Sequence, residues 1–503
     1  MNSRVLWLLP AALIGALLPV AGAAPATAAS TLPLLTVQPA DKFTLIYDDS
    51  GTGADDDVSI WRPNLASYPG FFSLGDVAMD SHGRAPANTF LVRGSGDALA
   101  RPVGFRWVWD DKGSGGDQDG SLWEPVAPAG YTCLGTVATP NYSKPSTDVV
   151  RCIRSEYTVP GKPAKVWDDS GSGADHDAGL WQSDPRDHLG LPPSTFVARP
   201  SHGDPGGDAR YRVLNKRLTD APVLAGRPVD ATVTRLLAPR VRLHPQERFF
   251  PSSAQFHLAN VHESGGYLVT NEPLGCDDCT GPAFLDGQRP DQVPVSAYAE
   301  IVPRTEGGAP TNVTDVFYWF FYPYNQGKQV CIGLDTPAGC AGEYERFGNH
   351  VGDWEHIAIR FVDNLPARVF YSQHSGGKEF AFGDKRVNLA GWRPLVYSAN
   401  GSHASYPNLG VHVYRELPNG GVLADDTAAG QLWDTAPALV PFRWQRPGSY
   451  AGSLAWLNIT SRWGNPKSGC EISEPITGEC VLNDGPTGPA QKGYAQPPLG
   501  PLE

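Results

Sequence analysis

The chain has 503 residues with 56 glycines and 47 prolines, and this content is too high for a mainly helical protein. Its formal net charge of −13 argues against binding to nucleic acid and against simple electrostatic docking on anionic lipid. We therefore expect an all-β protein in which many short strands are joined by turns, divided into two or more domains.

The first 29 residues are expected to form a signal peptide. Arg4 precedes an apolar stretch at 5–20, and Ala26-Thr27-Ala28 is an Ala-x-Ala cleavage signal. The rest of the sequence has no second apolar run of the about 18 residues that a membrane-spanning helix requires. The sequence therefore predicts a secreted protein without a transmembrane segment.

The eight cysteines fall into four pairs that are close in sequence. An even number of cysteines in an exported chain indicates disulfide bonds. The expected pairs are Cys133–Cys152, Cys276–Cys279, Cys331–Cys340 and Cys470–Cys480. For the Cys-x-x-Cys pair, a redox motif and half of a zinc site are alternatives. We favour a structural disulfide there, because no βαβ pattern surrounds it.

A pattern that occurs three times occupies residues 41–215. Each copy has the form aromatic-D-D-x-G-x-G-x-D-x-D-x-x-x-W, and the copies lie 62 and 58 residues apart. They begin at Tyr47, Trp109 and Trp167 and end at Trp61, Trp123 and Trp181. A single unit cannot bury its apolar face alone, so we expect three units to close around a pseudo-threefold axis as a β-prism-like module.

The Asp- and Gly-rich turn of each copy has two interpretations. Clustered carboxylates on a flexible loop suit calcium. Alternatively, the aspartates cap the turn by hydrogen bonds to the backbone while glycine supplies a positive φ, which we favour because the spacing differs from that of an EF-hand loop. The residues concerned are Asp48, Asp49, Asp55, Asp57, Asp110, Asp111, Asp117, Asp119, Asp168, Asp169, Asp175 and Asp177.

A second domain is expected at 232–483, after a Pro- and Gly-rich linker at about 200–228. The continuous apolar run at 316–321 is typical of a strand covered on both faces. With further strands after it, this domain is predicted to be a β-sandwich, followed by a Pro/Gly-rich tail at 484–503.

The run His350-Val351-Gly352-Asp353-Trp354-Glu355-His356 leads into one of these strands. Side chains alternate along a strand, so Asp353 and Glu355 share its inward, apolar face. Because burying an unpaired carboxylate is costly, a cation must sit there. The sequence therefore predicts a divalent metal site of His350, Asp353 and Glu355, with Mg²⁺, Ca²⁺, Mn²⁺ and Zn²⁺ all open. A polar network with Arg or Lys, or acids exposed to solvent, is the alternative.

Two more histidines, His374 and His403, follow strand ends and are expected near the same cavity as candidate acid/base groups. The segment Gly401-Ser402-His403 lacks the G-x-S-x-G elbow of serine hydrolases. The sequence also has no Walker loop, Rossmann fingerprint or H-E-x-x-H motif. A nucleophile is not evident, so the sequence leaves open whether the protein is an enzyme.

Several segments of the second half resemble the vacuolar protein sorting-associated protein 62 family. They are Leu243-His244-Pro245-x-Glu247, Phe249-x-Pro251-Ser252-Ser253, the aromatic run 318–325, Gly352-Asp353-Trp354-Glu355-His356, Ser372-Gln373-His374 and Gly401-Ser402-His403-Ala404. The resemblance covers most of residues 235–460, and the repeat upstream looks like the β-prism-type region found beside it. That family has no firmly established activity, so the resemblance implies a fold and a grouping rather than a mechanism.

A more distant likeness concerns His350-x-x-Asp353-Trp354-Glu355, which is similar to the G-H-R-H-D-W-E heptad of necrosis-inducing, cytolysin-like secreted proteins. Members of that family have a β-sandwich fold and bind glycolipid headgroups. Their His, Asp and Glu at this spacing hold a divalent cation. Here Gly352 replaces the second His of the heptad and Asn349 its leading Gly. The resemblance implies the metal and does not extend to cytolysis.

Together these features predict a secreted protein that binds a divalent cation and a carbohydrate or glycolipid headgroup on a cell surface or envelope. The alternative is a secreted metal-dependent hydrolase of an ester or phosphate bond, in which the cation polarises the bond and His403 or His374 serves as acid/base. An open coordination position would favour the hydrolase, whereas a saturated site would favour a structural role.

Overall fold

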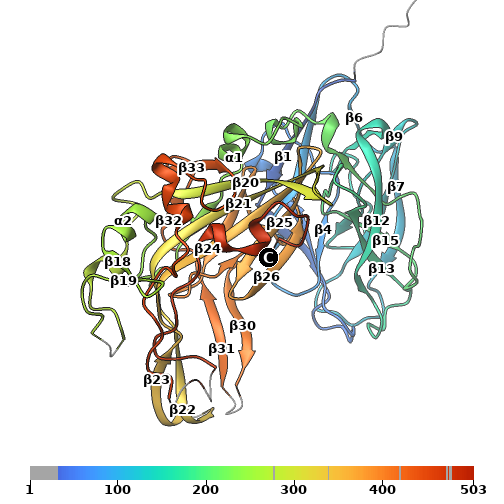
Figure 1. The fold of residues 1–503 in the computed structure, drawn as a ribbon. Helices are drawn as coiled ribbons and strands as arrows, with labels where there is room; N and C mark the ends of the chain where they lie inside the picture. Colours follow the sequence, from blue (N-terminus) through green and yellow to red (C-terminus); the bar gives the residue numbers. More distant parts are fainter. Residues whose placement is uncertain are drawn as a thin grey trace, which may run out of the picture.

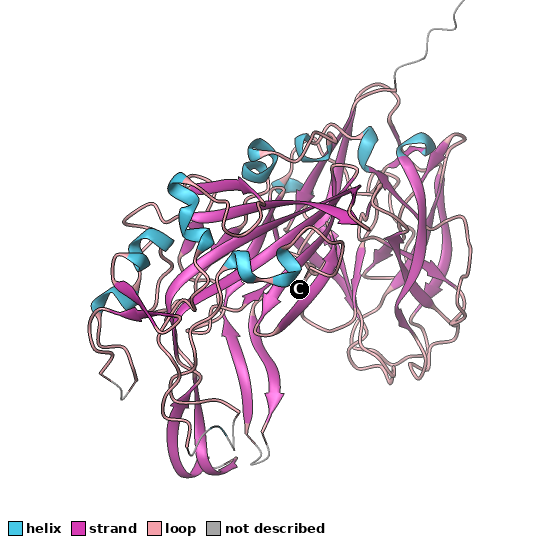
Figure 2. Ribbon diagram, in the orientation of Figure 1, coloured by secondary structure: helices cyan, strands magenta, loops and turns pink. Residues whose placement is uncertain are grey.

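The computed structural model describes residues 32–275, 278–337, 339–417, 421–471, 474 and 478–502. Most of its regular structure is β-strand, and its helices are short (Figure 2). The all-β prediction is therefore confirmed. The signal peptide predicted for residues 1–29 lies outside the described residues. Among the residues that are described, no helix is both long and apolar enough to cross a membrane.

Each sequence repeat forms the same three-stranded antiparallel unit. The units consist of β2 (Phe43–Asp48), β3 (Ser59–Pro63) and β4 (Val77–Met79); of β7 (Gly104–Asp110), β8 (Ser121–Val126) and β10 (Val137–Thr139); and of β12 (Thr158–Asp168), β13 (Gly179–Pro185) and β15 (Phe196–Arg199). In every unit the first strand has a β-bulge just before the aromatic residue that begins the repeat. The closing tryptophans Trp61, Trp123 and Trp181 take equivalent positions, each paired with a valine of the third strand.

Hydrogen bonds that recur from unit to unit close the three units into a ring. At the Asp-rich turns, the backbone N–H groups of Asp55, Asp117 and Asp175 donate to the carbonyls of Ser170, Ser50 and Lys112, each at 2.8 Å. A second set links Asp76 to Thr136, Thr136 to Phe196 and Phe196 to Asp76. Both sets form closed cycles, as the predicted pseudo-threefold arrangement requires. The prism shape itself stays a prediction.

Short strands and 3-10 helices complete the first half and lead into the second. They are β1 (Leu35–Ala40), β5 (Thr89–Gly94), β6 (Leu99–Ala100), β9 (Tyr131–Thr132), β11 (Cys152–Arg154), β14 (Gly190–Leu191), β16 (Arg212–Asn215), η1 (Leu65–Ser67), η2 (Ser155–Tyr157), η3 (Lys216–Leu218) and η4 (Pro222–Leu224). Strand β1 pairs with β5, and β16 extends the sheet of the third repeat through β12.

Two larger sheets form the centre of the second half. The six-stranded sheet has the order β26 (Gly376–Ala381), β25 (Leu365–Gln373), β24 (His350–Val362), β21 (Ala309–Asn325), β20 (Ala297–Glu306) and β33 (Leu439–Arg443). The five-stranded sheet has the order β27 (Leu389–Ala390), β28 (Arg393–Ser398), β17 (Arg240–Arg242) and β32 (Leu432–Asp434), with β29 (Ser405–Tyr406) paired to β28.

The central strand β21 is covered on both faces, as its apolar run predicts. Tyr318, Phe320 and Tyr322 pack in the main core together with residues of the five-stranded sheet. The alternate residues, such as Trp319 and Phe321, pack in a second core with the C-terminal segment. The two sheets therefore pack face to face, and the six-stranded sheet is also covered on its other side.

Three hairpins and several short helices surround these sheets. The elements are α1 (Ala231–Leu236), α2 (Ala254–Leu258), η5 (Ala283–Asp286), η6 (Gly452–Asn458), η7 (Pro489–Gln491), η8 (Gly493–Ala495), and the hairpins β18–β19 (Val261–Ser264, Tyr267–Thr270), β22–β23 (Lys328–Thr336, Gly339–Phe347) and β30–β31 (Gly410–Glu416, Val422–Thr427). The hairpins β22–β23 and β30–β31 project from the rest of the molecule (Figure 1).

The two halves pack closely together. The main core contains side chains from both the repeat region and the two large sheets, and Phe90 stacks on Trp392 at 5.5 Å between ring centroids. The ammonium group of Lys216 donates to the carbonyl of Pro366 at 2.7 Å. One continuous core therefore joins the two regions. The domain bounds predicted from the sequence stay a prediction.

The segment predicted as a Pro/Gly-rich tail lies against the six-stranded sheet. Ala490, Ala495 and Leu502 are buried in the second core. Arg304 and Arg360 reach this segment, where their guanidinium groups donate to the carbonyls of Tyr494 at 2.9 Å and Gly500 at 2.7 Å. This segment therefore covers one face of the six-stranded sheet.

Three of the four predicted disulfides are present: Cys133–Cys152, Cys331–Cys340 and Cys470–Cys480. The fourth pair includes Cys276, which lies outside the described residues. Each observed bond joins cysteines 9 to 19 residues apart, as local loop closures.

Candidate functional site

Strand β24 buries the two carboxylates of the predicted metal motif. Asp353 and Glu355 are 5% and 7% exposed, and they share a strand face with Ile357 and Ile359 of the main core. The strand face predicted from the sequence is therefore correct. Gly352 has a φ of +69°, and a Cβ added there would lie 1.8 Å from the carbonyl oxygen of Trp463. Glycine is required at this position because another chain segment passes so close.

His403 lies next to Asp353 and is fully enclosed. Its Nδ1 donates to Asp353 Oδ2 at 3.0 Å, and its Nε2 donates to the carbonyl of Phe249 at 3.0 Å. The imidazole stacks on the ring of Tyr322 at 3.8 Å. Burial lowers the pKa of His403, but the charges of Glu247 and Asp353 outweigh it and raise the pKa to about 9. His403 is therefore an imidazolium that fixes Asp353, and it has no nitrogen left for proton transfer to a bound molecule.

Glu247 supports His403 from the opposite side. Its Oε1 lies 3.7 Å from His403 Nε2 and accepts the backbone N–H of Phe249, while its Oε2 accepts that of Gly401 at 2.9 Å. Burial raises the pKa of Glu247, but His403 and these backbone donors together hold it below its ordinary value. The sequence prediction did not include Glu247 among the site residues, although it belongs to the Leu-His-Pro-x-Glu segment.

Glu355 is held differently from Asp353. Ser372 donates its hydroxyl to Glu355 Oε2 at 2.8 Å. Burial, followed by the charge of Asp353, raises the pKa of Glu355 well above its ordinary value. Lys492, from the C-terminal segment, lines a cavity together with Asp353 and Glu355. Burial lowers the pKa of Lys492, although both carboxylates oppose this shift. A cation bound between the acids would relieve their mutual repulsion.

A further buried carboxylate, Asp425, connects hairpin β30–β31 with Lys328, His374 and the segment 402–406. It accepts hydrogen bonds from Ser402 at 2.6 Å, Tyr406 at 2.8 Å and His374 at 2.7 Å, and it pairs with Lys328 at 2.7 Å. Burial opposes ionisation, but His374 and Lys328 hold the pKa of Asp425 below its ordinary value. No motif in the sequence pointed to Asp425, because its partners come from three separate segments, around residues 328, 374 and 402–406.

These groups surround a cavity of about 230 Å³. Its lining combines carboxylates, amides, two hydroxyls, two lysines, two imidazoles and the aromatic side chains of a tryptophan and a tyrosine. The lining residues are Asn325, Gly327, Lys328, Gly348, His350, Asp353, Trp354, Glu355, His374, Ser402, Tyr414, Glu479, Asn483, Pro486 and Lys492. The structure thus brings His350, Asp353, Glu355 and His374 to one cavity, with His403 directly behind Asp353.

The predicted metal ligands have side-chain types that suit a divalent cation, but their ligand atoms are not close enough together to share one in this geometry. The Nδ1 of His350 donates to the carbonyl of Gly352 at 2.7 Å, which leaves Nε2 as the acceptor nitrogen, an orientation common in metal-binding histidines. However, His350, Asp353 and Glu355 are not among the groups of described residues whose ligand atoms all lie within 4.8 Å of one another. A shared cation would require side-chain adjustment, and the site stays a prediction.

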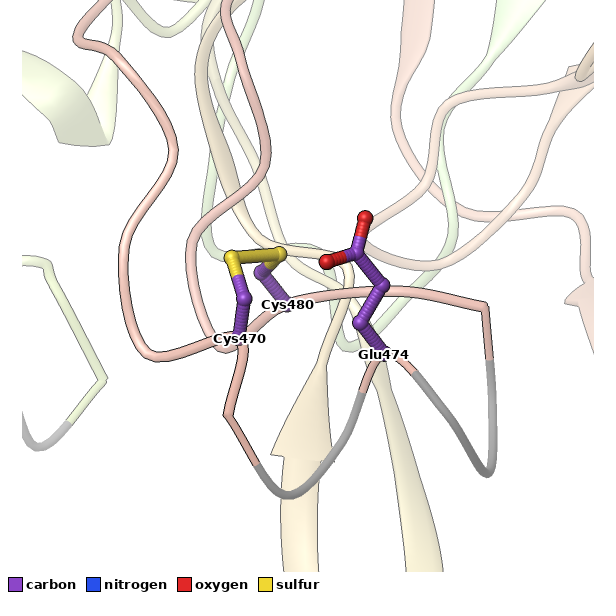
Figure 3. A group of neighbouring side chains, drawn as sticks. All are labelled: Cys470, Glu474 and Cys480. Atoms are coloured by element: carbon purple, nitrogen blue, oxygen red, sulfur yellow. A yellow bond between two sulfur atoms is a disulfide. The ribbon is translucent and has the colours of Figure 1, made fainter.

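One of the groups that do meet this distance criterion is not a metal site. It consists of Cys470, Glu474 and Cys480, and Figure 3 shows the two sulfur atoms bonded to each other beside the glutamate. A disulfide has no thiolate to offer a metal. Glu474 pairs instead with Lys467 at 2.9 Å.

The other two groups lie at the turns of the first and third repeats. His82 Nε2 lies 2.5 Å from Asp49 and 3.8 Å from Asp57. In the third repeat His202 Nε2 lies 2.6 Å from Asp169 and 3.9 Å from Asp177. In the second repeat Tyr142 takes the equivalent place and donates to Asp119 at 2.9 Å.

The aspartates of the repeats already cap their own turns. Asp49, Asp111 and Asp169 each accept the backbone N–H of the residue nine positions later, at 2.9, 3.0 and 2.7 Å. Asp48 and Asp168 accept the backbone N–H two residues later, whereas Asp110 accepts a hydrogen bond from the side-chain ammonium group of Lys112. The side chains of Asp55, Asp117 and Asp175 face Gly171, Gly51 and Gly113 of a neighbouring unit. This geometry is that of the structural turn, and calcium there stays a prediction.

Comparison with known proteins groups the chain by sequence. A family model described as vacuolar protein sorting-associated protein 62 matches residues 9–271 and 291–477. Two relatives from Saccharomyces cerevisiae are each 29% identical: vacuolar protein sorting-associated protein 62, over 46% of this chain and 51% of the relative, and putative vacuolar protein sorting-associated protein TDA6, over 37% and 41%. This chain thus spans about half of the length of the curated relatives it matches.

Solved structures show more limited likeness. The crystal structure of GNIP1Aa from Chromobacterium piscinae matches at 24% identity and a TM-score of 0.34, over 38% of each chain. A structure described as a toxin fold for microbial attack and plant defense matches at 15% identity and a TM-score of 0.21, over 43% of this chain and 76% of the other. NLPPya in complex with mannosamine matches at 13% identity and a TM-score of 0.23, over 50% of this chain and 89% of the other. At these TM-scores, no function is inferred from them.

Proposed function

This chain belongs to the vacuolar protein sorting-associated protein 62 family, and on that premise we propose that it is an exported binding protein whose cavity holds a carbohydrate or glycolipid headgroup together with a divalent cation. Export is supported by the Ala26-Thr27-Ala28 signal and by three disulfide bonds.

The lining of the cavity is the observation that carries this proposal. Several kinds of hydrogen-bonding group line it, among them the amides of Asn325 and Asn483 and the hydroxyl of Ser402. Tyr414, whose ring packs on His374 at 3.9 Å, adds an aromatic surface. A polyhydroxylated ring needs such a combination of donors, acceptors and an apolar face. The volume, about 230 Å³, lies below the about 300–1,000 Å³ usual for drug-sized ligands, so it suits a small headgroup.

The cation is supported by the two buried carboxylates of β24, Asp353 and Glu355. His350 Nε2, Asp353 Oδ1 and Glu355 Oε1 are the ligand atoms that would hold it, because the second atom of each side chain is hydrogen-bonded to Gly352, His403 or Ser372. When bound, a divalent cation would neutralise the two carboxylates and coordinate sugar hydroxyls. His403 and Ser372 would keep the carboxylates oriented with or without it.

The hydrolase alternative is supported by His374 alone. This histidine lines the cavity, keeps 32% of its side chain exposed and is oriented by the buried Asp425. His403, the other candidate acid/base, is enclosed on both ring nitrogens. Binding is therefore the better supported function.

A glycan and glycolipid array, probed with and without chelator, tests the proposal. Mannosamine, which is named with one of the matched structures, belongs among the first probes. We expect saturable binding that is lost with chelator and in Asp353→Asn. The control is Glu300→Gln, because Glu300 is a buried acid of the same sheet, outside the cavity, whose pKa burial raises to about 8. Wild-type protein that binds no glycan and no cation would contradict the proposal, and turnover of an ester or phosphate substrate that depends on His374 would support the hydrolase.

A further inference from the structure

The two projecting hairpins, β22–β23 and β30–β31, lie side by side (Figure 1). We call them together the hairpin arm, with described residues 328–337, 339–347, 409–417 and 421–427. They pack on each other through Val330 and Phe347 of one hairpin and Leu417 and Leu423 of the other. Lys328 and Tyr414 belong to the arm and also line the cavity. A molecule that fills the cavity therefore meets the arm.

The arm concentrates the exposed apolar side chains of the molecule. Seven of the 15 large hydrophobic residues that are exposed in the described part of the chain lie on it. They are Leu334, Tyr344, Leu409, Val411, Val413, Tyr414 and Val422. Single exposed hydrophobic residues are ordinary, but a gathering on one projection indicates an interaction surface.

The apolar residues of β30–β31 face outward together. Leu409, Val411 and Val413 alternate along the chain, so their side chains share one face. Val413 pairs with Ala424, and Val422 is two residues from Ala424 on the same face of β31. Val411 is 69% exposed and Leu409 49%. The inner face of the same hairpin carries Leu423 and Asp425, which are buried against the other hairpin and the cavity.

The charge of the arm restricts what this surface can contact. Its sequence contains three basic residues, Lys328, Arg346 and Arg415, against six acidic ones, Asp335, Glu343, Glu345, Glu416, Asp425 and Asp426. Anionic membranes are bound through clusters of Lys and Arg, which the arm lacks. A bilayer surface with uncharged or zwitterionic headgroups has no such requirement.

We propose that the hairpin arm lies on a lipid bilayer of net-neutral headgroups, with its outward apolar side chains in the interface and the headgroup of a neutral glycolipid in the cavity at its base. Through Lys328 and Tyr414 the polar cavity adjoins a projection that carries exposed apolar side chains, and a ligand with a polar head and an apolar tail combines the same two chemistries. The headgroup part rests on the proposed function, whereas the contact with the bilayer rests on the arm.

Vesicle flotation of the full chain tests the contact. The probes are vesicles of phosphatidylcholine alone, of phosphatidylcholine with hexosylceramides, and of phosphatidylcholine with phosphatidylserine. We expect the wild-type protein to float with the hexosylceramide vesicles. Val411→Asp should weaken this association about tenfold or more, as expected when a valine is kept out of apolar surroundings. Val103→Asp is the matched control, because Val103 is equally exposed at 69% but lies outside the arm.

The outcomes separate this inference from the proposed function. If wild-type protein binds free hexosides but floats with none of the vesicles, the arm proposal is overturned and the function stands. If it floats equally with phosphatidylcholine alone, and Val411→Asp abolishes this, the arm proposal holds and the headgroup role fails. Flotation that requires phosphatidylserine overturns the arm proposal. A loss of flotation in Val103→Asp as large as the loss in Val411→Asp overturns it as well. Sedimentation velocity identifies the remaining case: a dimer that Val411→Asp dissociates, without vesicle binding, makes the arm an interface between two copies.

Discussion

The repeat region and the cavity region both bury aspartates, but the hydrogen-bond partners of these aspartates differ. In the repeats, Asp49, Asp111 and Asp169 each accept a backbone N–H from nine residues later, within their own turns, and Asp49 and Asp169 also accept the indole N–H of a tryptophan from another repeat. At the cavity, Asp353 bonds to a histidine 50 residues away, and Asp425 to one 51 residues away. An acid that caps its own turn supports local structure, whereas an acid held by distant segments depends on the whole fold.

The largest effect is expected where the repeats join one another. Trp109 is 1% exposed and donates its indole N–H to Asp169 Oδ2 and to the carbonyl of His176 in the third repeat. Trp109→Ala should lower the free energy of unfolding by about 3–5 kcal/mol, measured by denaturant titration. Trp107→Ala, two residues away and 42% exposed, is the control and should cost less than about 1 kcal/mol. Equal losses would mean that the ring does not depend on this contact.

A loss confined to the cavity side is expected from Asp425→Ala. Removing this carboxylate leaves Lys328, His374 and two hydroxyls without their shared acceptor, at a cost of about 3 kcal/mol. Hydrogen exchange should show the loss in β30–β31, while the three repeats keep their protection. The neighbouring Asp426, whose side chain is 58% exposed, serves as control and should change stability by less than about 0.5 kcal/mol as Asp426→Ala. Loss of protection throughout the chain would contradict a local role.

The pH dependence of stability should also differ between the regions. The pKa of His403 is raised to about 9 in the folded protein, above its ordinary value of about 6.5. The contribution of protonated His403 to the free energy of unfolding is therefore complete below about pH 6.5 and is lost as the pH rises through about 9. In this range the free energy of unfolding should fall by at most about 1.4 kcal/mol per pH unit. Denaturant titrations across this range, in wild type and His403→Gln, measure it. An unchanged slope in the variant would show that another group titrates.

The smallest effect is expected at the surface of the repeats. The hydrogen bond to Asp49 is the main cause that raises the pKa of His82, so its contribution is present at low pH and lost as the pH rises. His82→Tyr installs the residue type found at the equivalent position, Tyr142, and should change stability by about 0.5 kcal/mol or less at pH 8. Thermal unfolding of this variant and of the reciprocal Tyr142→His measures it. A change well above 1 kcal/mol in either would mean that the three turns are not interchangeable.

The repeat shows how much a sequence pattern predicts when partners are local. The spacing from Tyr47 to Trp61 recurs twice, and the turns, bulges and tryptophan positions followed it. The disulfides were predictable for the same reason, since 9 to 19 residues separate the cysteines. Local hydrogen bonds and short loop closures are encoded within one stretch of chain.

The cavity shows where this approach ends. Strand periodicity placed Asp353 and Glu355 on an inward face, and their burial confirms it. The same reasoning gave His403 an acid/base role, although contacts with Phe249 and Asp353 enclose it, and it did not identify Asp425 or Lys492.

The sequence by itself determined the β-strands, the threefold repeat, the local disulfides and the inward direction of two acids, because each depends on neighbours within a few tens of residues. Only the tertiary structure decided which groups surround the cavity. Glu247, Asp353 and His403 come from segments that lie far apart along the chain, and the charges of the two acids raise the pKa of the buried histidine. Pairing between distant buried charges is set by the packing of the whole sheet, which no single segment specifies.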